Sequence, residues 1–437
     1  MSNFEIGILS FPALLALIFM RVPIGLAMFT TGFVGLWLIN GSTFMAMARL
    51  KTETFTTFSS YSLSIVPMFL LMGYFATLGG MSQALFKAAE AWIGHRRGGI
   101  AMAAVGACAG FGAICGSSLA TAATMGRVAL PELRKYGYAG GFSTATLAAG
   151  GTLGILIPPS IVLVIYAILT EQNIAKLFLA AVIPGIMAAL GYVLVISIYV
   201  RLNPEAGGVR ERVPYGERLR ALFNVWPVLL VFLAVVGGIY AGIFTPTEGA
   251  AVGAFGTGLI AWWNGGLTRK TLMASFLSTG RSTAMIFFIV LGAGFYNGFL
   301  ALTQVPQELS AFVVEQGFSP WLVLAIILAL YLVFGCVMDS LSMILLTIPI
   351  FFPVISGLDF GLTPEQVAIW FGIMVLIVVE VGLITPPVGM NLFIINSMDR
   401  GTPITATYRA VMWFVASDIV RVIILAAFPA ITLFLIS

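Results

Sequence analysis

Charged side chains are scarce in this chain: they make up 9% of its 437 residues, whereas hydrophobic residues make up 60%. Soluble domains carry about 25% charged residues. The mean hydropathy is +1.07, and runs of roughly 20 apolar residues, the length that crosses a bilayer, recur throughout. The composition therefore excludes a soluble globular domain and predicts an all-α membrane protein that crosses the bilayer many times.

Histidine and cysteine are nearly absent. His95 is the single histidine and lies in a basic loop, so neither a Ser-His pair nor a histidine-rich metal site can form. The three cysteines, Cys108, Cys115 and Cys336, lie in apolar segments, where an odd number does not indicate a disulfide framework. The chain also contains no phosphate-binding G-x-x-x-x-G-K-[ST] motif. The lack of a catalytic histidine pair and of a phosphate-binding motif argues against an enzyme and against direct use of ATP.

The positions of the basic residues indicate which loops lie on the cytoplasmic side of the membrane. The net charge is +4, but Lys and Arg are spread over short connecting loops, so no nucleic-acid partner is expected. Basic residues favour the cytoplasmic side of a membrane. The stretch 98–135 is flanked at both ends by such residues, Arg96-Arg97 and Arg134-Lys135. Both ends are therefore expected inside, which predicts a re-entrant helical hairpin that enters from the cytoplasm.

Two related phrases interrupt apolar runs about half a chain apart: Gly154-Ile-Leu-Ile-Pro158-Pro159 and Gly382-Leu-Ile-Thr-Pro386-Pro387. Gly and Pro weaken a helix by about 1 and 3 kcal/mol respectively. Irregular backbone at membrane depth persists only where it is buried in protein or lines a cavity. Paired broken segments in two halves of a chain are typical of a transporter's binding site. Transport is therefore the function that the pattern favours.

A second hairpin is expected at 320–355, because this long apolar stretch has no Lys or Arg near its ends and therefore enters from the opposite face. The chain then divides into two inverted repeats. Residues 1–200 contain scaffold helices, the hairpin 98–135 and a broken helix at 140–170. Residues 223–437 contain scaffold helices, the hairpin 320–355 and a broken helix at 365–398. A cytoplasmic linker at 201–222 joins them, and amphipathic stretches at 42–60, 81–95, 267–279 and 303–317 are expected along the membrane interface.

The hairpin tips and helix breaks supply the ligands expected near the bilayer midplane. Freed carbonyls and hydroxyls suit a hard cation such as Na⁺, and half-helix N-termini suit an anionic group. The candidates in the first half are Gly116, Ser117, Ser118, Gly151, Thr152, Gly154, Pro158, Pro159 and Ser160. The candidates in the second half are Asp339, Ser340, Gly382, Thr385, Pro386 and Pro387.

Charged residues inside apolar spans cost roughly 3 kcal/mol or more each, so each needs a role. Asp339, at the second tip, either contacts substrate or cation, or caps the returning helix. Glu380 either contacts a ligand or pairs with a cation such as Arg281. Asp418 and Arg421, spaced i, i+3, are expected to pair with each other.

These motifs resemble a known family. Gly116-Ser117-Ser118-Leu-Ala, Gly154-Ile-Leu-Ile-Pro158-Pro159, Asp339-Ser340 and Glu380-Val-Gly382-Leu-Ile-Thr385-Pro386-Pro387-Val-Gly389 are similar to the large membrane subunit of tripartite ATP-independent periplasmic (TRAP) transporters, the DctM-like family. The resemblance covers essentially the whole chain.

The resemblance implies a Na⁺-driven, elevator-type importer of a small organic acid in the bacterial inner membrane. It implies two partners, a separate four-helix membrane subunit and a periplasmic substrate-binding protein. It maps the substrate pocket onto Ser117, Ser160 and Asp339. The Na⁺ sites map onto Gly116, Ser117, Ser118, Gly151, Thr152, Gly154, Pro158, Ser340, Gly382, Thr385 and Pro386. Dicarboxylates, sugar acids, keto acids and compatible solutes all fit such a pocket.

Three alternatives stay open on the sequence. The first is a stand-alone Na⁺/carboxylate symporter or Na⁺/H⁺ antiporter of the related inverted-hairpin architecture, which would not depend on a binding protein. The second is a membrane anchor or receptor that transports nothing, although polar tips at the midplane argue against it. The third is an intramembrane protease that uses Ser117, which the missing histidine disfavours.

Overall fold

The computed structural model describes residues 2–436, and every regular element within that range is helical. The N-terminal helices are α1 (Asn3–Phe19), α2 (Ile24–Asn40), α3 (Phe44–Phe58), α4 (Ile65–Leu78) and α5 (Met81–Ile93). The next group contains α6 (Gly99–Cys115), α7 (Ser118–Lys135), α8 (Gly140–Leu156), α9 (Ile161–Thr170) and α10 (Ile174–Leu202). The middle of the chain forms α11 (Tyr215–Phe223), α12 (Trp226–Phe232), α13 (Gly238–Tyr240), α14 (Pro246–Trp263), α15 (Arg269–Thr303) and α16 (Val305–Glu315). The C-terminal group is α17 (Pro320–Gly335), α18 (Ser340–Ser356), α19 (Pro364–Gly382), α20 (Met390–Met398), α21 (Ile404–Ala427) and α22 (Pro429–Leu433).

Within the described residues, five helical stretches are long and apolar enough to cross a membrane, and bent pairs raise the number to as many as seven. The five are 174–202, 215–240, 269–303, 364–382 and 404–427. The helices of one bent pair, α8 and α9, meet at 43°. The multi-span, all-helical prediction is therefore confirmed.

The predicted breaks fall where the helices stop. The first hairpin stretch divides into α6 and α7, and the first broken helix into α8 and α9. The second hairpin stretch divides into α17 and α18, and the second broken helix into α19 and α20. Side chains begin the returning halves: Ser117 caps α7, Ser160 caps α9 and Asp339 caps α18, each accepting a hydrogen bond from a backbone N–H of the first turn.

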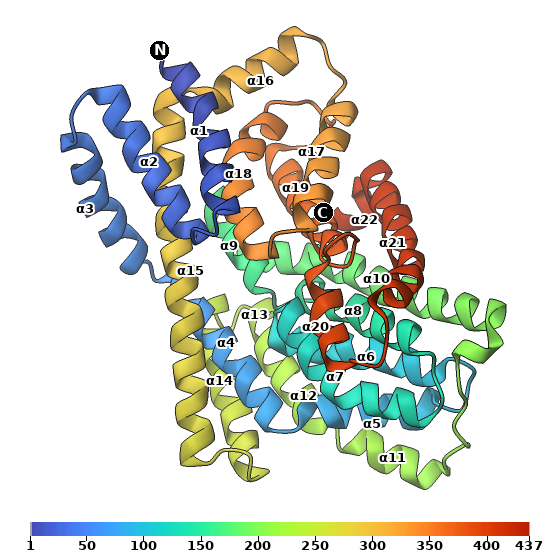
Figure 1. Cartoon of the computed structure of the whole chain (residues 1–437). Helices are drawn as coiled ribbons and strands as arrows, with labels where there is room; N and C mark the ends of the chain where they lie inside the picture. Colours follow the sequence, from blue (N-terminus) through green and yellow to red (C-terminus); the bar gives the residue numbers. More distant parts are fainter. Residues whose placement is uncertain (1, 437) are drawn as a thin grey trace.

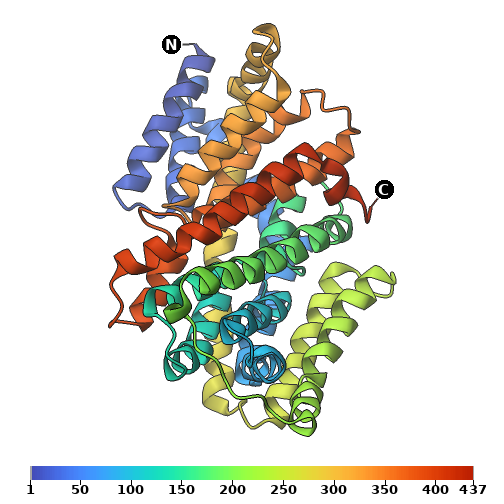
Figure 2. The same cartoon turned by 90° about the vertical axis from the view of Figure 1, so that its right-hand side faces the viewer.

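The helices pack in two regions around these breaks. The 35-residue α15 packs against α2 and α4 and runs along one side of the molecule (Figure 1). The helices α6 and α7 pack on α8, and α17 packs on α19, so each hairpin lies against a broken helix. The long helices α10 and α21 lie side by side and obliquely across the view in Figure 2.

One expected interfacial segment is not separate. The stretch 267–279 was expected to be an amphipathic connector, but residues 269–279 form the first turns of α15. No proline interrupts this helix, so its polar start continues directly into the apolar part. The prediction of a separate connector was therefore wrong. A 35-residue helix is about 52 Å long, more than the roughly 30 Å of a hydrocarbon core, so one helix accommodates both the polar start and the apolar span.

Candidate functional site

The first hairpin turns at Gly116 and Ser117. Gly116 has φ +63°, a left-handed conformation that glycine adopts without steric cost, and its N–H donates to the Gly112 carbonyl at 2.9 Å. Ser117 then starts α7, and its hydroxyl accepts from the N–H of Ala120 at 3.4 Å. The tip therefore presents a helix C-terminus and a helix N-terminus at one point.

The second hairpin turns at Cys336 to Asp339. The Asp339 carboxylate accepts hydrogen bonds from the N–H of Ser342 at 3.0 Å and from its hydroxyl at 2.6 Å. The capping role considered for this residue is therefore confirmed. Asp339 also lines a cavity, so its contact with a ligand stays a prediction.

Glycine pairs bring each hairpin against its broken helix. A Cβ added to Gly112 would lie 2.5 Å from the Cα of Gly154, and one added to Gly382 would lie 2.6 Å from the Cα of Gly335. Both pairs occupy the same place in their phrases, four residues before the tip or before the first proline. The Pro158-Pro159 and Pro386-Pro387 bonds are both cis. The two phrases thus share geometry as well as sequence.

A cavity of about 430 Å³ lies between the two tips and the helices α4 and α15; we call it the tip cavity. The first tip contributes residues 115–120, and the second contributes Asp339, Ser340 and Leu341. Across from them are Gly73, Tyr74 and Thr77 of α4 and Ser282, Met285 and Ile286 of α15. Its volume is within the range of small-molecule sites.

Among the described residues that line the tip cavity, Arg127 is the one basic residue and Asp339 is the one acidic residue. Arg127 lies on the same face of α7 as Ala120, Ala123 and Thr124. No role was predicted for Arg127 from the sequence, although it is a charged residue in the apolar stretch 98–135. Its spacing from Ala120, i to i+7 with two lining residues between, was the signal that places it at the tip.

Glu380 joins the two hairpins. Its side chain is 1% exposed, and its Oε1 atom accepts from the Ser340 hydroxyl at 2.6 Å and the Ser118 hydroxyl at 3.4 Å. Its Oε2 atom is buried and has no hydrogen-bond partner in the described structure. Arg281 is exposed and is not among the partners found for Glu380, so the suggested pairing is wrong.

The other candidate residues divide into two groups. Gly116, Ser117, Ser118, Asp339 and Ser340 line the tip cavity. The helix-break candidates lie outside its lining: Gly151, Thr152, Gly154, Pro158, Pro159, Ser160, Gly382, Thr385, Pro386 and Pro387.

The hydroxyls at the breaks already have hydrogen-bond partners. Thr152 lies 3.0 Å from the Tyr192 hydroxyl and donates to the Ala149 carbonyl at 2.6 Å. Thr385 donates to the Val381 carbonyl at 2.7 Å. Ser160 is fully buried as the cap of α9. A hydroxyl that donates a hydrogen bond keeps its lone pairs, so these residues can still offer oxygen to a cation.

The Asp418–Arg421 pair forms as expected, with 2.8 Å between Oδ1 and Nη2. Asp418 also accepts from the Tyr192 hydroxyl at 2.8 Å, and the guanidinium of Arg421 lies over the Tyr192 ring. This pair therefore holds α21 against α10 and does not line the tip cavity.

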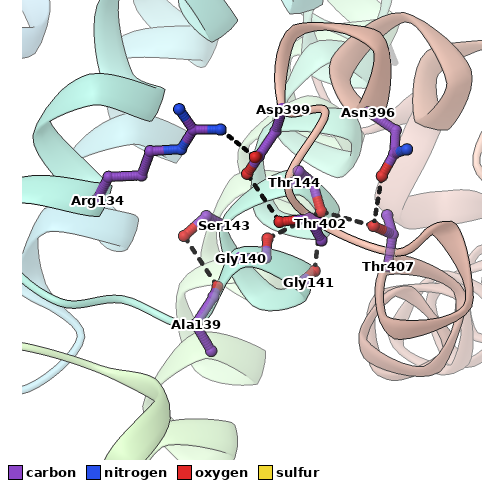
Figure 3. Close-up of polar contacts among 10 residues, drawn as sticks. All are labelled: Arg134, Ala139, Gly140, Gly141, Ser143, Thr144, Asn396, Asp399, Thr402 and Thr407. Carbon is purple, nitrogen blue, oxygen red and sulfur yellow. Dashed lines mark hydrogen bonds and ion pairs between the residues drawn. The ribbon is translucent and has the colours of Figure 1, made fainter.

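A second polar cluster connects the first hairpin and the first broken helix to the segment around α20 and α21 (Figure 3). Arg134, at the end of α7, pairs with the buried Asp399 after α20, and Thr402 donates to the same carboxylate at 2.9 Å. Thr144 of α8 lies 2.8 Å from Thr407 of α21, which donates to Asn396 of α20 at 3.1 Å. These contacts connect the first hairpin and broken helix to the turn between α20 and α21.

Comparisons with known proteins agree with this geometry. A family model described as the DctM component of tripartite ATP-independent periplasmic transporters matches residues 11–431. The C4-dicarboxylate TRAP transporter large permease protein DctM of Pseudomonas aeruginosa is 38% identical, over 89% of each chain. The ectoine large permease TeaC of Halomonas elongata is 30% identical over 97% of each chain. The isethionate permease DctMQ of Oleidesulfovibrio alaskensis is 30% identical over 92% of this chain and 63% of its own length.

The fold also has a likeness among solved structures. The YdaH transporter of Alcanivorax borkumensis matches with a TM-score of 0.59 over 87% of this chain and 88% of its own, at 12% sequence identity. At that level of sequence identity the match indicates a similar fold and nothing about function. The family match extends over nearly all of the chain and includes both tips and both breaks. The chain therefore belongs to the DctM-component family of TRAP transporters, as a multi-span membrane permease of a bacterial transporter and not an enzyme.

Proposed function

We propose that this chain is the large membrane subunit of a Na⁺-coupled importer of a small organic acid. The observation that carries the proposal is the tip cavity, which combines Arg127, Ser117 and Asp339 with the N-termini of α7 and α18. A guanidinium can bind a carboxylate with two parallel hydrogen bonds, and helix N-termini favour negative charge. The cavity therefore has the chemistry that an organic anion requires.

We assign substrate contact to Ser117 and Asp339, as expected, and add Arg127. Ser160 stays a proposed contact, although it lies outside the cavity in this conformation. C4-dicarboxylates are the first class to test, because three relatives at 32–38% identity are named as C4-dicarboxylate permeases. The second carboxylate of such a substrate would accept hydrogen bonds from the hydroxyl and N–H groups of the second tip.

Na⁺ is proposed to bind at the tips and breaks. The carbonyls and hydroxyls there supply the hard oxygen ligands that this ion prefers. The described residues hold no group of three or more His, Cys, Asp or Glu side chains placed to bind a transition metal. An alkali cation held by backbone and hydroxyl oxygens needs no such group.

Movement is proposed to carry the tips across the membrane as one unit. The unit would contain both hairpins and both broken helices, and the scaffold would contain the outer helices of two inverted repeats, 1–200 and 223–437. The tip cavity supports this division, because the tips form one wall and α4 and α15 the other. The polar cluster of Figure 3 supports it too, because it connects α7 and α8 to the α20–α21 turn.

The partners proposed are a separate small four-helix membrane subunit and a periplasmic substrate-binding protein, in the bacterial inner membrane. The family is tripartite by description, and one relative carries the joint name DctMQ. Loaded binding protein would release its substrate to the tips when they face the periplasm.

Uptake into proteoliposomes tests the function. The chain is reconstituted with its small subunit and supplied with binding protein and a radiolabelled C4-dicarboxylate. We expect uptake only with an inward Na⁺ gradient and with binding protein present. Uptake that ignores the Na⁺ gradient contradicts the coupling, and uptake without binding protein favours the stand-alone symporter.

Arg127→Gln tests the substrate contact in the same assay. Loss of a charge-assisted hydrogen bond is expected to raise the half-saturating substrate concentration about 10- to 100-fold. Arg281→Gln is the matched control, since Arg281 is exposed on α15 beside Ser282 but outside the cavity lining. If the two substitutions had equal effects, Arg127 would not be a substrate contact.

A further inference from the structure

The segment between α10 and α11 is held against neighbouring helices. The N–H of Arg210 donates to the Gly94 carbonyl at 3.2 Å, and its guanidinium pairs with Glu90 of α5 at 3.0 Å. The indole N–H of Trp92 donates to the Arg218 carbonyl at 3.3 Å, which attaches α11 to α5. These hydrogen bonds and the ion pair fix α11 against the end of α5.

A cluster of basic side chains lies where α11 meets the end of α5. Arg218 is 3% exposed; its Nε donates to the Val213 carbonyl at 2.9 Å, and its Nη2 atom is buried without a hydrogen-bond partner in the described structure. The Arg212 and Arg218 guanidinium carbons lie 5.5 and 5.2 Å from the centre of the Tyr215 ring. Arg212 also donates to the Tyr215 hydroxyl at 2.8 Å. Arg212 and Arg218 thus both contact Tyr215, and Arg218 has a buried N–H group without an acceptor.

His95 lies beside this cluster, because its neighbour Gly94 accepts a hydrogen bond from Arg210 and the nearby Trp92 donates to the Arg218 carbonyl. Its Nδ1 atom is buried without a hydrogen-bond partner in the described structure. Burial, and then the positive charges of Arg218, Arg212 and Arg96, lower the pKa of the imidazole. The guanidinium groups repel one another, and a buried donor without a hydrogen-bond partner is destabilising. A phosphate group would supply both the negative charge and the missing acceptors.

The surroundings point to a lipid as the source of that phosphate. The helix α11 lies across one end of the molecule, at the same end as the turn between α14 and α15 (Figure 1). It exposes Leu219 and Phe223, and Trp226 at the start of α12 is exposed as well. The α14–α15 turn begins after the exposed Trp263. Exposed Trp at a helix end and a basic amphipathic helix are both typical of the membrane surface.

We propose that His95, Arg212, Tyr215 and Arg218 bind the phosphate group of an anionic phospholipid, with α11 lying in the membrane surface. The exposed apolar side chains of α11 contact the acyl chains, and the two guanidinium groups contact the phosphate oxygens. The site is independent of the tip cavity and of the proposed transport function.

The full chain in lipid nanodiscs tests the proposal. Because His95 is the single histidine, ring-labelled histidine in a tag-free chain gives one set of NMR signals that reports on the site. Nanodiscs of phosphatidylcholine alone are compared with nanodiscs that contain increasing fractions of phosphatidylglycerol. We expect a saturable shift of the His95 signals with phosphatidylglycerol, and a lipid adduct retained in native mass spectrometry.

Substitutions distinguish a built site from general charge. Each arginine near a membrane surface contributes about a fivefold preference for anionic lipid, so Arg212→Gln should weaken the response about fivefold, and Arg212→Gln with Arg218→Gln about 25-fold. Arg212 is exposed, so its single variant tests the site even if the double variant fails to fold. Arg269→Gln, at an exposed arginine at the start of α15, is the matched control: it also removes one charge at this end of the molecule, and it should weaken the His95 response clearly less than Arg212→Gln does.

Three results would overturn the proposal. The first is the absence of a His95 shift with phosphatidylglycerol. The second is an equal loss in Arg269→Gln, which would indicate unspecific attraction. The third is a full shift produced by inorganic phosphate in phosphatidylcholine nanodiscs, which would assign the site to a soluble anion.

Discussion

Glu380 is the residue on which the two hairpins converge. Its partners, Ser118 and Ser340, are the first residues of α7 and α18, the returning arms of the two hairpins. Its Oε1 atom accepts from both hydroxyls and therefore bridges the starts of the two arms. Because both tips line the tip cavity, a group that holds them together also sets the width of the cavity. We therefore assign Glu380 a positioning role.

Substitution of Glu380 tests that role. Glu380→Ala leaves two buried hydroxyls without their shared acceptor, which is expected to destabilise the protein by about 1–3 kcal/mol. Uptake should fall further than the loss of folded protein explains, with a raised half-saturating concentration of Na⁺ or substrate. The measurements are thermal unfolding in detergent and uptake in proteoliposomes.

Glu365→Ala, on the same helix α19, is the control. Glu365 forms an exposed ion pair with Lys176 at 2.6 Å, a kind of contact worth about 0–1 kcal/mol. Wild-type half-saturating concentrations in Glu380→Ala would show that the carboxyl contributes to stability alone.

At the scale of elements, close approach between hairpins and broken helices requires small residues. In α6, Gly112 meets Gly154 of α8, whereas Gly106 on the same helix has open space around it. Small residues at such crossings let helix backbones approach closely in membranes. The glycines that open both phrases therefore serve packing, and the helices stop only after them.

Two substitutions in α6 separate these effects. Gly112→Ala places a Cβ 2.5 Å from the Gly154 Cα, so the helices must move apart, at a cost of about 1–3 kcal/mol. Gly106→Ala meets nothing and should stabilise the helix by roughly 0.4–1 kcal/mol. Thermal unfolding of both variants measures the difference. If Gly112→Ala is as stable as Gly106→Ala, the close contact between α6 and α8 is refuted.

The sequence predicted the interrupted elements better than the continuous ones. The breaks at Gly116, Pro158, Asp339 and Pro386 were found because Gly, Pro and helix-capping residues act locally. The sequence wrongly predicted that 267–279 is separate from the apolar part of α15. Charged residues beside an apolar run look like a helix boundary, because the sequence does not show which surroundings those residues contact. Local chemistry determines where a helix stops, whereas its surroundings determine how far it continues.

The whole molecule is proposed to work by movement of the tips past α4 and α15. Cross-linking across the tip cavity tests this, in a chain whose cysteines at 108, 115 and 336 are replaced. A flexible bismaleimide between Met285→Cys of α15 and Ala120→Cys of the first tip should abolish uptake. The same reagent between Tyr74→Cys of α4 and Ser282→Cys of α15 connects two scaffold helices and should leave uptake largely intact. Uptake by the first cross-linked pair would contradict an elevator movement.

The sequence by itself determined the class of protein, the positions of the four breaks and the family, because hydropathy, helix-breaking residues and short motifs are local properties. The tertiary structure decided which residues meet. It brought Arg127 to the tips, placed Glu380 between Ser118 and Ser340 instead of beside Arg281, and put Ser160 outside the tip cavity. It also joined the end of α5, next to His95, to the segment that carries Arg210 and Arg218. Such contacts depend on how helices cross, and a one-dimensional pattern of residues contains no crossing angles or distances.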